Sequence, residues 1–172
     1  MRDEVKPLLD RLLADVREAL PLETMWAHGS LALGDYQPGR SDLDMVAVVR
    51  SEITPAQRQR VGLLHKKLDA DLPEAAKLHC SYMVRSTLAD TGARHLTWAH
   101  RHLQERDVTP VSRRELRTGD LSLFGPPPTD FSPRSPTGSW PTTSAATSGT
   151  TGCPPRPGPS AGSRTSGWTW AC

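Results

Sequence analysis

Two acidic residues, Asp42 and Asp44, stand at the start of an apolar run that continues to Val49. Side chains two positions apart on a β-strand point to the same face, so the two carboxylates should lie side by side. Adjacent carboxylates resist burial unless a cation compensates their charge. A hard divalent cation such as Mg²⁺ prefers these oxygen ligands and is completed by water and phosphate oxygens. The pair therefore indicates metal-assisted phosphoryl transfer.

Gly29 and Ser30 follow a short apolar segment, and Ser30 precedes Ser41 by 11 residues. A glycine lets the backbone approach a ligand closely, and a serine hydroxyl with neighbouring amides can hold a phosphate. Ser41 can donate to another phosphate oxygen, and Arg40 can reach a phosphate or pair with an aspartate beside it. A lone Gly-Ser or Asp-x-Asp is weak evidence. Their combination at this spacing, with a buried strand after the acids, is much more specific.

The elements that must position these residues predict an α/β (α+β) fold. Apolar residues at three- and four-residue spacing predict a helix from Val5 to Leu20, ended by Pro21. Thr54-Pro55 begins a second helix, which Pro73 closes. Loop-forming residues fill the stretch after Gly29-Ser30, and apolar runs predict three strands, over 24–28, 42–49 and 78–84. We expect a mixed β-sheet flanked by helices.

The rest of the first 124 residues adds less specific signals. Ser112–Glu115 resembles a capping box that opens a short helix, and 121–124 reads as another strand. Trp98, His100 and His102 are predicted to share an amphipathic helical face rather than a metal site. His65 is placed on the solvated face of its helix, and Cys80 is expected to be a small buried core residue.

Composition excludes several classes of function. Residues 1–124 hold 18 Lys/Arg and 18 Asp/Glu, so this part is neutral and gives no electrostatic reason to expect a nucleic-acid partner. No apolar stretch is long enough to predict a membrane span, and the charged N-terminus does not resemble a signal peptide. Three scattered cysteines fit neither a disulfide framework nor a zinc site. We expect a cytoplasmic protein.

The sequence changes character at Gly125. Among residues 125–172, 34 of 48 are Pro, Gly, Ser or Thr, and there is no Leu, Ile, Val or Met. Such a segment cannot bury enough apolar surface to offset an ordering entropy of ~1–2 kcal/mol per residue. We therefore predict one folded domain over 1–124 and a disordered low-complexity tail over 125–172.

A frameshift would explain this tail. The chain has no Asn and 17 Arg against 4 Lys, which suggests a GC-rich gene. When codons are read from the old third base, residues 142–151 and 167–172 become compatible with aliphatic, aromatic and acidic residues typical of globular proteins. Our hypothesis is that a frameshift near residues 125–140 replaced a genuine second domain; a natural low-complexity tail is the alternative.

The segment from His28 to Val46, with Gly29-Ser30 and Ser41-Asp42-Leu43-Asp44, resembles the signature of DNA polymerase beta-like nucleotidyltransferases. Within them it is most similar to the aminoglycoside (streptomycin/spectinomycin-type) adenylyltransferases. The resemblance implies that Asp42 and Asp44 bind Mg²⁺ and that Gly29, Ser30 and Ser41 hold the phosphates of ATP. It also implies that AMP passes to a drug hydroxyl, in a cleft that a C-terminal helical domain completes.

One position departs from this family. The family's third carboxylate, usually a Glu on the next strand, corresponds here to His79. His79 can act as a base near neutral pH, or it can be a structural histidine beside an emptied site. Glu74 is close in sequence but falls in the loop after Pro73.

Three functions remain open from the sequence. The first is transfer of AMP from Mg-ATP to a hydroxyl of a small molecule such as an aminoglycoside. The second is a nucleotide-binding remnant or regulatory protein with impaired catalysis, which His79 and the tail favour. The third is a nucleotidyltransferase that modifies a protein or RNA, against which the neutral charge weighs for RNA.

Overall fold

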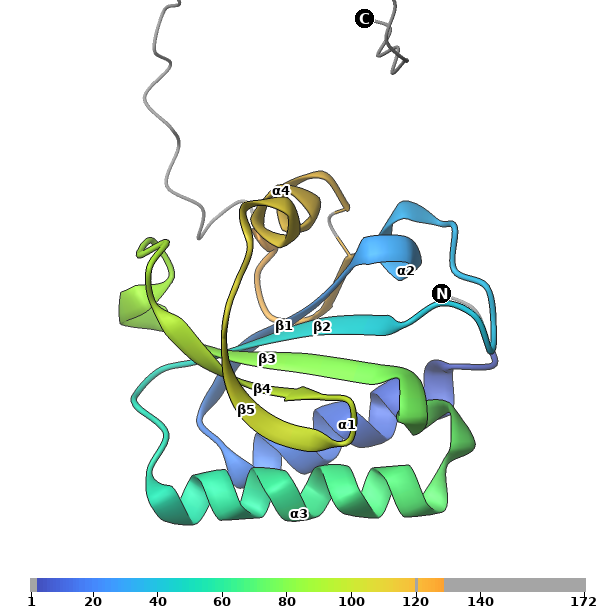
Figure 1. The fold of residues 1–172 in the computed structure, drawn as a ribbon, viewed down its shortest axis with the longest axis horizontal. Helices are drawn as coiled ribbons and strands as arrows, with labels where there is room; N and C mark the ends of the chain where they lie inside the picture. Colours follow the sequence, from blue (N-terminus) through green and yellow to red (C-terminus); the bar gives the residue numbers. More distant parts are fainter. Residues whose placement is uncertain (1–2, 120, 129–172) are drawn as a thin grey trace, which may run out of the picture. The chain divides into compact units, whose positions relative to one another are not determined.

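The structure, a computed structural model, describes residues 3–119 and 121–128. They fall within Met1–Ser135, and the residues after 128, with most of the predicted tail and of the region proposed for the frameshift, lie outside the described residues. A six-stranded sheet lies between two helical layers, with α1 and α3 on one face and α2 and α4 on the other (Figure 1). The predicted α/β fold with a mixed sheet flanked by helices is confirmed.

The predicted helices and strands appear in the predicted order, including the strand at 121–124, and the structure adds three short helices and two strands between residues 94 and 107. In chain order they are α1 (Lys6–Ala19), β1 (Leu22–His28), α2 (Gly29–Leu33), β2 (Leu43–Val49), α3 (Pro55–Asp71), η1 (Pro73–Lys77), β3 (Leu78–Val84), η2 (Arg85–Thr87), β4 (Arg94–Ala99), β5 (His102–Asp107), α4 (Pro110–Gly119) and β6 (Leu121–Phe124). The short helix α2 stands where the sequence indicated only a turn at Gly29-Ser30.

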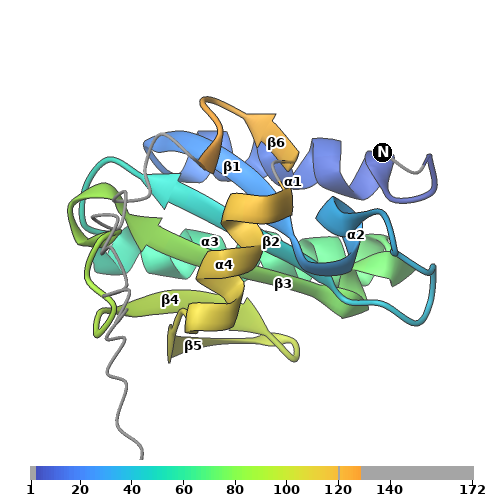
Figure 2. The same cartoon turned by 90° about the horizontal axis from the view of Figure 1, so that it is seen from above.

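The sheet has the strand order β5-β4-β3-β2-β1-β6. Strands β2 and β3 are parallel, and the other neighbouring pairs are antiparallel. A parallel pair needs a crossover connection, and α3 is that crossover. Figure 2 shows α4 lying across the strands on the face opposite α3.

Helices α1 and α3 bury their apolar stripes against the sheet, as the three- and four-residue spacing predicted. Leu8, Leu12 and Val16 of α1 and Val61 and Leu68 of α3 lie in the main hydrophobic core. Helix α3 begins with a capping box, in which Thr54 Oγ1 accepts from the Gln57 amide and Gln57 Oε1 accepts from the Thr54 amide. A second apolar cluster lies on the other face, under α4: Trp26, Val46, Val48, Met83, Leu88, Val108 and Leu116.

The predicted helical face at Trp98, His100 and His102 is wrong. These residues belong to a β-hairpin, in which Ala99 pairs with His102 around a two-residue turn. The turn residues His100 and Arg101 have φ of 51° and 66°, as a type I′ hairpin turn requires. Such turns usually carry Gly or Asn, so these two residues gave no turn signal.

The predicted solvated position of His65 is also wrong. His65 is 1% exposed, and its ring stacks on Trp98 with 4.8 Å between ring centroids. Its Nε2 shares a hydrogen bond of 2.7 Å with the Tyr82 hydroxyl. Burial lowers the pKa of His65 to about 3, so the ring is neutral in the folded protein. Cys80 is buried as predicted.

Helix α4 begins two residues before the predicted capping box. The Ser112 amide donates to Thr109 Oγ1 at 3.1 Å, so Thr109 rather than Ser112 caps the helix and Pro110 is its first residue. Proline is favoured at that first position because it has no amide hydrogen to satisfy. Ser112 lies inside the first turn.

The segment after β6 is held against the start of β1. Thr24 Oγ1 lies 2.6 Å from the carbonyl of Phe124, and Trp26 Nε1 donates to the carbonyl of Pro126 at 2.8 Å. Gly125 has φ of 72°, and a Cβ there would meet the Glu23 carbonyl oxygen at 2.5 Å. Only glycine fits so close to the neighbouring backbone.

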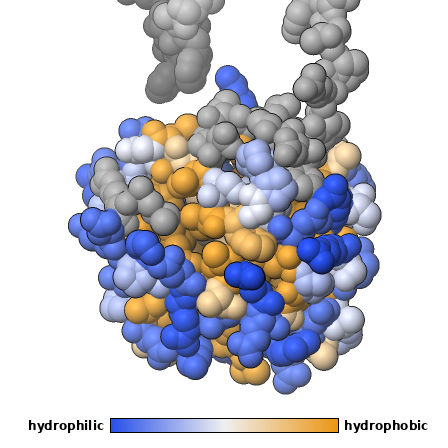
Figure 3. Space-filling view, turned by 180° about the vertical axis from the view of Figure 1, so that it is seen from behind, coloured by the Kyte–Doolittle hydropathy of each residue, from blue (hydrophilic) through white to orange (hydrophobic). Residues whose placement is uncertain are grey.

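The face behind Figure 1 carries apolar side chains at its centre, framed by charged ones (Figure 3). Helix α1 and strand β6 lie on this side in Figure 2, and their half-buried Leu13, Leu121 and Leu123 pack against the main core. No helix in the described part of the chain is long and apolar enough to cross a membrane.

We predict that His65 makes the stability of the protein depend on pH. Its folded pKa of about 3 lies below the ordinary value of 6.5, so the unfolded chain binds more protons between these values. The contribution of neutral His65 to the free energy of unfolding is therefore fully present above pH 6.5. It decreases as the pH falls, by up to ~1.4 kcal/mol per pH unit. His65→Phe keeps an aromatic ring on Trp98 and should flatten this dependence in urea unfolding between pH 7 and pH 5.

The slope with pH, rather than the absolute stability, is the measured quantity, because His65→Phe also removes the hydrogen bond between His65 and the Tyr82 hydroxyl. Burial also lowers the pKa of His95, so this histidine should leave a residual slope with pH in the variant. The exposed His102 supplies the control, and His102→Gln should keep the slope of the parent protein. An unchanged slope in His65→Phe would contradict the prediction.

Candidate active site

The sheet register brings three polar residues into one row across β1, β2 and β3. The Cα partner of Asp44 is His28 on β1 and His79 on β3. Directly opposed residues share a face of the sheet. His79 Nδ1 lies 3.4 Å from Asp44 Oδ1, so this histidine contacts the carboxylate that the sequence singled out. The structure thus brings together Asp44 and His79, two of the three predicted catalytic residues.

Gly29 lies directly against the carboxylate of Asp44. Its φ is 60°, and a Cβ at this position would be 2.7 Å from Asp44 Oδ2. The backbone conformation favours glycine here, and any side chain at this position would require the Asp44 carboxylate to move. The sequence predicted that the backbone at Gly29 approaches a ligand closely; in the structure, the group close to Gly29 is the side chain of Asp44.

Asp42 precedes β2 and is the more exposed of the two aspartates. Its side chain is 48% exposed, and Oδ1 lies 3.6 Å from Nζ of Lys77. Lys77 also donates to the carbonyl of Arg40 at 3.2 Å. Lys77 was missed by sequence reasoning. The parallel register, in which Leu43 pairs with Leu78, places the residue before each strand at the same edge of the sheet.

The predicted phosphate-binding residues lie in the loop and short helix beside the aspartates. Ser41 Oγ accepts from the Gln37 amide at 3.0 Å, which closes the loop before β2 and leaves the hydroxyl hydrogen available for donation. The side chain of Arg40 is exposed and makes no ion pair with an aspartate of the described residues. The carbonyl of Ser30 accepts from the Asp35 amide at 2.9 Å. Exposed Glu74 lies in η1.

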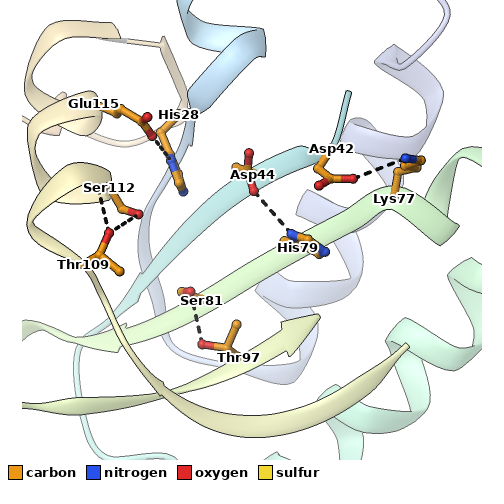
Figure 4. A network of polar contacts seen from close by, with 10 residues as sticks. All are labelled: His28, Asp42, Asp44, Lys77, His79, Ser81, Thr97, Thr109, Ser112 and Glu115. Atoms are coloured by element: carbon orange, nitrogen blue, oxygen red, sulfur yellow. Dashed lines mark hydrogen bonds and ion pairs between the residues drawn. The ribbon is translucent and has the colours of Figure 1, made fainter. Parts of the chain in front are cut away.

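A second pair that the sequence did not indicate joins the site from α4. His28 Nδ1 lies 3.2 Å from Glu115 Oε2, and the His28 side chain is 12% exposed. Figure 4 shows the His28 ring reaching from Glu115 toward the space beside Asp44. The two residues are 87 positions apart, so only the packing of α4 against β1 reveals the pair.

These residues border a cavity of about 220 Å³ between the sheet and the start of α4. Its lining includes His28, Asp44 and His79, together with hydroxyl groups of β3, β4 and α4. Ser81 Oγ and Thr97 Oγ1 are 3.1 Å apart, and Thr109 Oγ1 and Ser112 Oγ are 3.1 Å apart. Figure 4 shows these hydroxyl pairs below and beside the Asp44–His79 contact.

The donor set fits a hard cation only in part. Within residues 3–119 and 121–128, no group of three or more His, Cys, Asp and Glu side chains is placed to hold a metal ion. Asp42 and Asp44 offer carboxylate oxygens, whereas an imidazole such as His79 is a poor ligand for Mg²⁺. Two carboxylates suit a Mg²⁺ ion that arrives with a nucleotide, because phosphate and water oxygens then supply the other ligands.

The contact between Gly29 and Asp44 can be measured by a double-mutant cycle. Gly29→Ala should destabilise the protein by ~1 kcal/mol more than Gly34→Ala, because the added methyl group meets the carboxylate. Gly34 has φ of 83° and open space around its Cβ, so Gly34→Ala measures backbone strain alone. The excess should disappear in an Asp44→Ala background in urea unfolding. Equal losses for both alanine variants would argue against the close contact.

Comparison with known proteins agrees with this arrangement. The sequence model of the family described as "Nucleotidyltransferase domain" matches residues 9–93, a range that contains both aspartates, Gly29 and His79. A crystal structure of spectinomycin adenyltransferase AAD(9) from Enterococcus faecialis, with ATP and spectinomycin, is similar in fold. The TM-score is 0.57 at 13% sequence identity, over 74% of this chain and 59% of that chain.

This chain therefore spans less than two thirds of the length of that structure. No curated protein matches it in sequence. At 13% identity the structural similarity concerns the fold, whereas the family match rests on the sequence itself. The chain belongs to the nucleotidyltransferase superfamily, whose domain model matches residues 9–93.

Proposed function

We propose that the protein transfers AMP from Mg-ATP to a hydroxyl group of a small molecule. The observation that carries this proposal is the placement of Asp44 against Gly29 and beside the cavity, within a nucleotidyltransferase domain. The similar spectinomycin adenyltransferase structure contains ATP and spectinomycin, which supports ATP as donor and suggests an aminoglycoside as acceptor. The proposed setting is cytoplasmic.

In this proposal the residues of the site have separate tasks. Asp42 and Asp44 hold Mg²⁺, which would stabilise the negative charge of the transferring phosphoryl group. Gly29, Ser30, Ser41 and the exposed Arg40 face the phosphates. Lys77 lies beside Asp42 and reduces the repulsion between the two carboxylates before the cation binds.

The reaction is a displacement at the α-phosphorus of ATP. The acceptor oxygen forms a bond to this phosphorus, the bond to the bridging oxygen breaks, and pyrophosphate leaves with the electron pair. The hydroxyl proton passes to a base, for which His79 is our candidate. Its place in the cavity, in contact with Asp44, supports this role.

Two other functions remain as alternatives. The contact of His79 with Asp44, where the family usually has a carboxylate, favours a nucleotide-binding remnant or regulatory protein with impaired catalysis. A nucleotidyltransferase that modifies a protein or RNA is the second alternative. Binding of Mg-ATP without turnover with any acceptor would favour the remnant.

The binding of Mg-ATP tests the two aspartates. Asp42→Asn and Asp44→Asn should each weaken binding at least ~10-fold, since a charged ligand contributes ~1.5–3 kcal/mol. Removing a carboxylate also relieves repulsion, so the fold should be retained. Calorimetry with Mg²⁺ and with a chelator measures the effect. Asp71→Asn, at an exposed position of α3, is the matched control. Unchanged affinity in both site variants would refute the assignment.

We also predict little or no adenylyl transfer by the 172-residue chain. Catalysis of phosphoryl transfer depends on holding the acceptor in line, and we expect the Pro-, Gly-, Ser- and Thr-rich segment after residue 125 to supply no second wall. Restoring the reading frame should recover far more activity than His79→Glu in the present chain. The assay is pyrophosphate release from ATP with a panel of aminoglycosides. Strong acceptor-dependent release by the present chain would contradict this argument.

A further inference from the structure

The cavity beside Asp44 extends away from the residues proposed to hold the phosphates. Gly29 and Ser30 begin α2, whereas the cavity extends from His28 at the end of β1 across β3 and β4 to Arg106 on β5. The strand order places Asp44 on β2, between these two sides. Attacking and leaving groups lie in line on opposite sides of the transferring phosphorus. With pyrophosphate on the β1 side, the cavity is the place for the acceptor; this step rests on the proposed function.

Arg106 brings an unpaired positive charge to this cavity. Its Cα partner on β4 is His95, and Thr97 pairs with Gln104 in the same ladder, so Arg106 and Thr97 share the face of the sheet on which Asp44 lies. The guanidinium makes no hydrogen bond or ion pair with any residue that the structure describes. A guanidinium presents several donors that match the geometry of a phosphate or carboxylate.

Each acidic group around the cavity has a basic partner among the described side chains, and that of Asp107 is a solvent-exposed ion pair. Asp107 Oδ1 lies 3.7 Å from Arg94 Nε, Glu115 contacts His28, and Asp44 contacts His79 and is assigned to the cation. A cationic acceptor such as an aminoglycoside, which the similar structure suggested, would therefore meet Arg106 with no free carboxylate among the described residues to balance it, so this cavity argues against that class of acceptor. The hydroxyl pairs of β3, β4 and α4 offer hydrogen bonds to a hydroxylated molecule.

We propose that this cavity accepts a small hydroxylated molecule that carries an anionic group, and that Arg106 binds that phosphate or carboxylate. The volume of about 220 Å³ is below the ~300–1,000 Å³ typical of pockets for drug-sized ligands, so a compact acceptor fits best. Arg106 thereby selects the acceptor by charge at a distance from the transferred group.

Four matched hexoses test this proposal on the full 172-residue chain. Glucose is neutral, glucosamine is cationic, and glucuronate and glucose 6-phosphate carry a carboxylate and a phosphate. Affinities are measured by calorimetry with saturating Mg²⁺ and a non-hydrolysable ATP analogue. At least one anionic hexose should bind roughly 10- to 100-fold tighter than glucose and glucosamine, since a charge-assisted hydrogen bond contributes that much. The stronger of the two anions identifies the preferred group.

Arg106→Gln should remove this preference, and Arg60→Gln, at an exposed position of α3 on the other face of the sheet, should retain it. The proposal would be overturned if glucosamine or spectinomycin bound most tightly, or if all affinities were equal. It would also be overturned if no hexose bound, or if the anion preference survived Arg106→Gln. A preliminary titration of the nucleotide analogue distinguishes a failure of the proposed function from a failure of the proposal about Arg106. If the analogue does not bind, the proposed function fails, and the hexose series without nucleotide still measures the selectivity of Arg106.

Discussion

The parallel pairing of β2 with β3 is the constraint on which the candidate site depends. It aligns the starts of two strands at the same edge of the sheet, so Asp44 meets His79 and Asp42 meets Lys77. A parallel connection also requires a long crossover, and α3 fills that role while covering one face of the sheet. The other face is left for α2 and α4, and the cavity forms there. The positions of the candidate site residues and of the helices on both faces of the sheet therefore follow from one strand pairing.

Much of this arrangement could be predicted because its signals are local. Apolar spacing predicted α1, the double-sided apolar run predicted the buried strand β2, and Thr54-Pro55 marked the start of α3. The motif residues Gly29 and Asp44 were identified from type and spacing alone, and the contact between them explains why their spacing matters. Their roles toward a nucleotide remain predictions.

The remaining features depend on contacts that are distant in sequence or on unusual backbone conformations. The hairpin turn places His100 and Arg101, two non-glycine residues, in the left-handed region, and no sequence pattern predicted this conformation. His65 looked like part of a charged helix face, yet it stacks on Trp98 from a strand more than 30 residues later. The His28–Glu115 pair, and the charge of Arg106 that no described residue pairs with, likewise appear only once the sheet order is known.

The hydrogen bonds from Thr24 and Trp26 to the segment after β6 have a consequence for synthesis. Their partners, Phe124 and Pro126, lie 100 residues or more further along the chain. At ~5–20 residues per second, a ribosome needs about 5–20 s to reach them after β1 has been made. During that interval the outer edge of β1 has no β6 to pair with, and an open strand edge can recruit another chain. This edge of β1 is therefore open to another chain until β6 has emerged and paired with it.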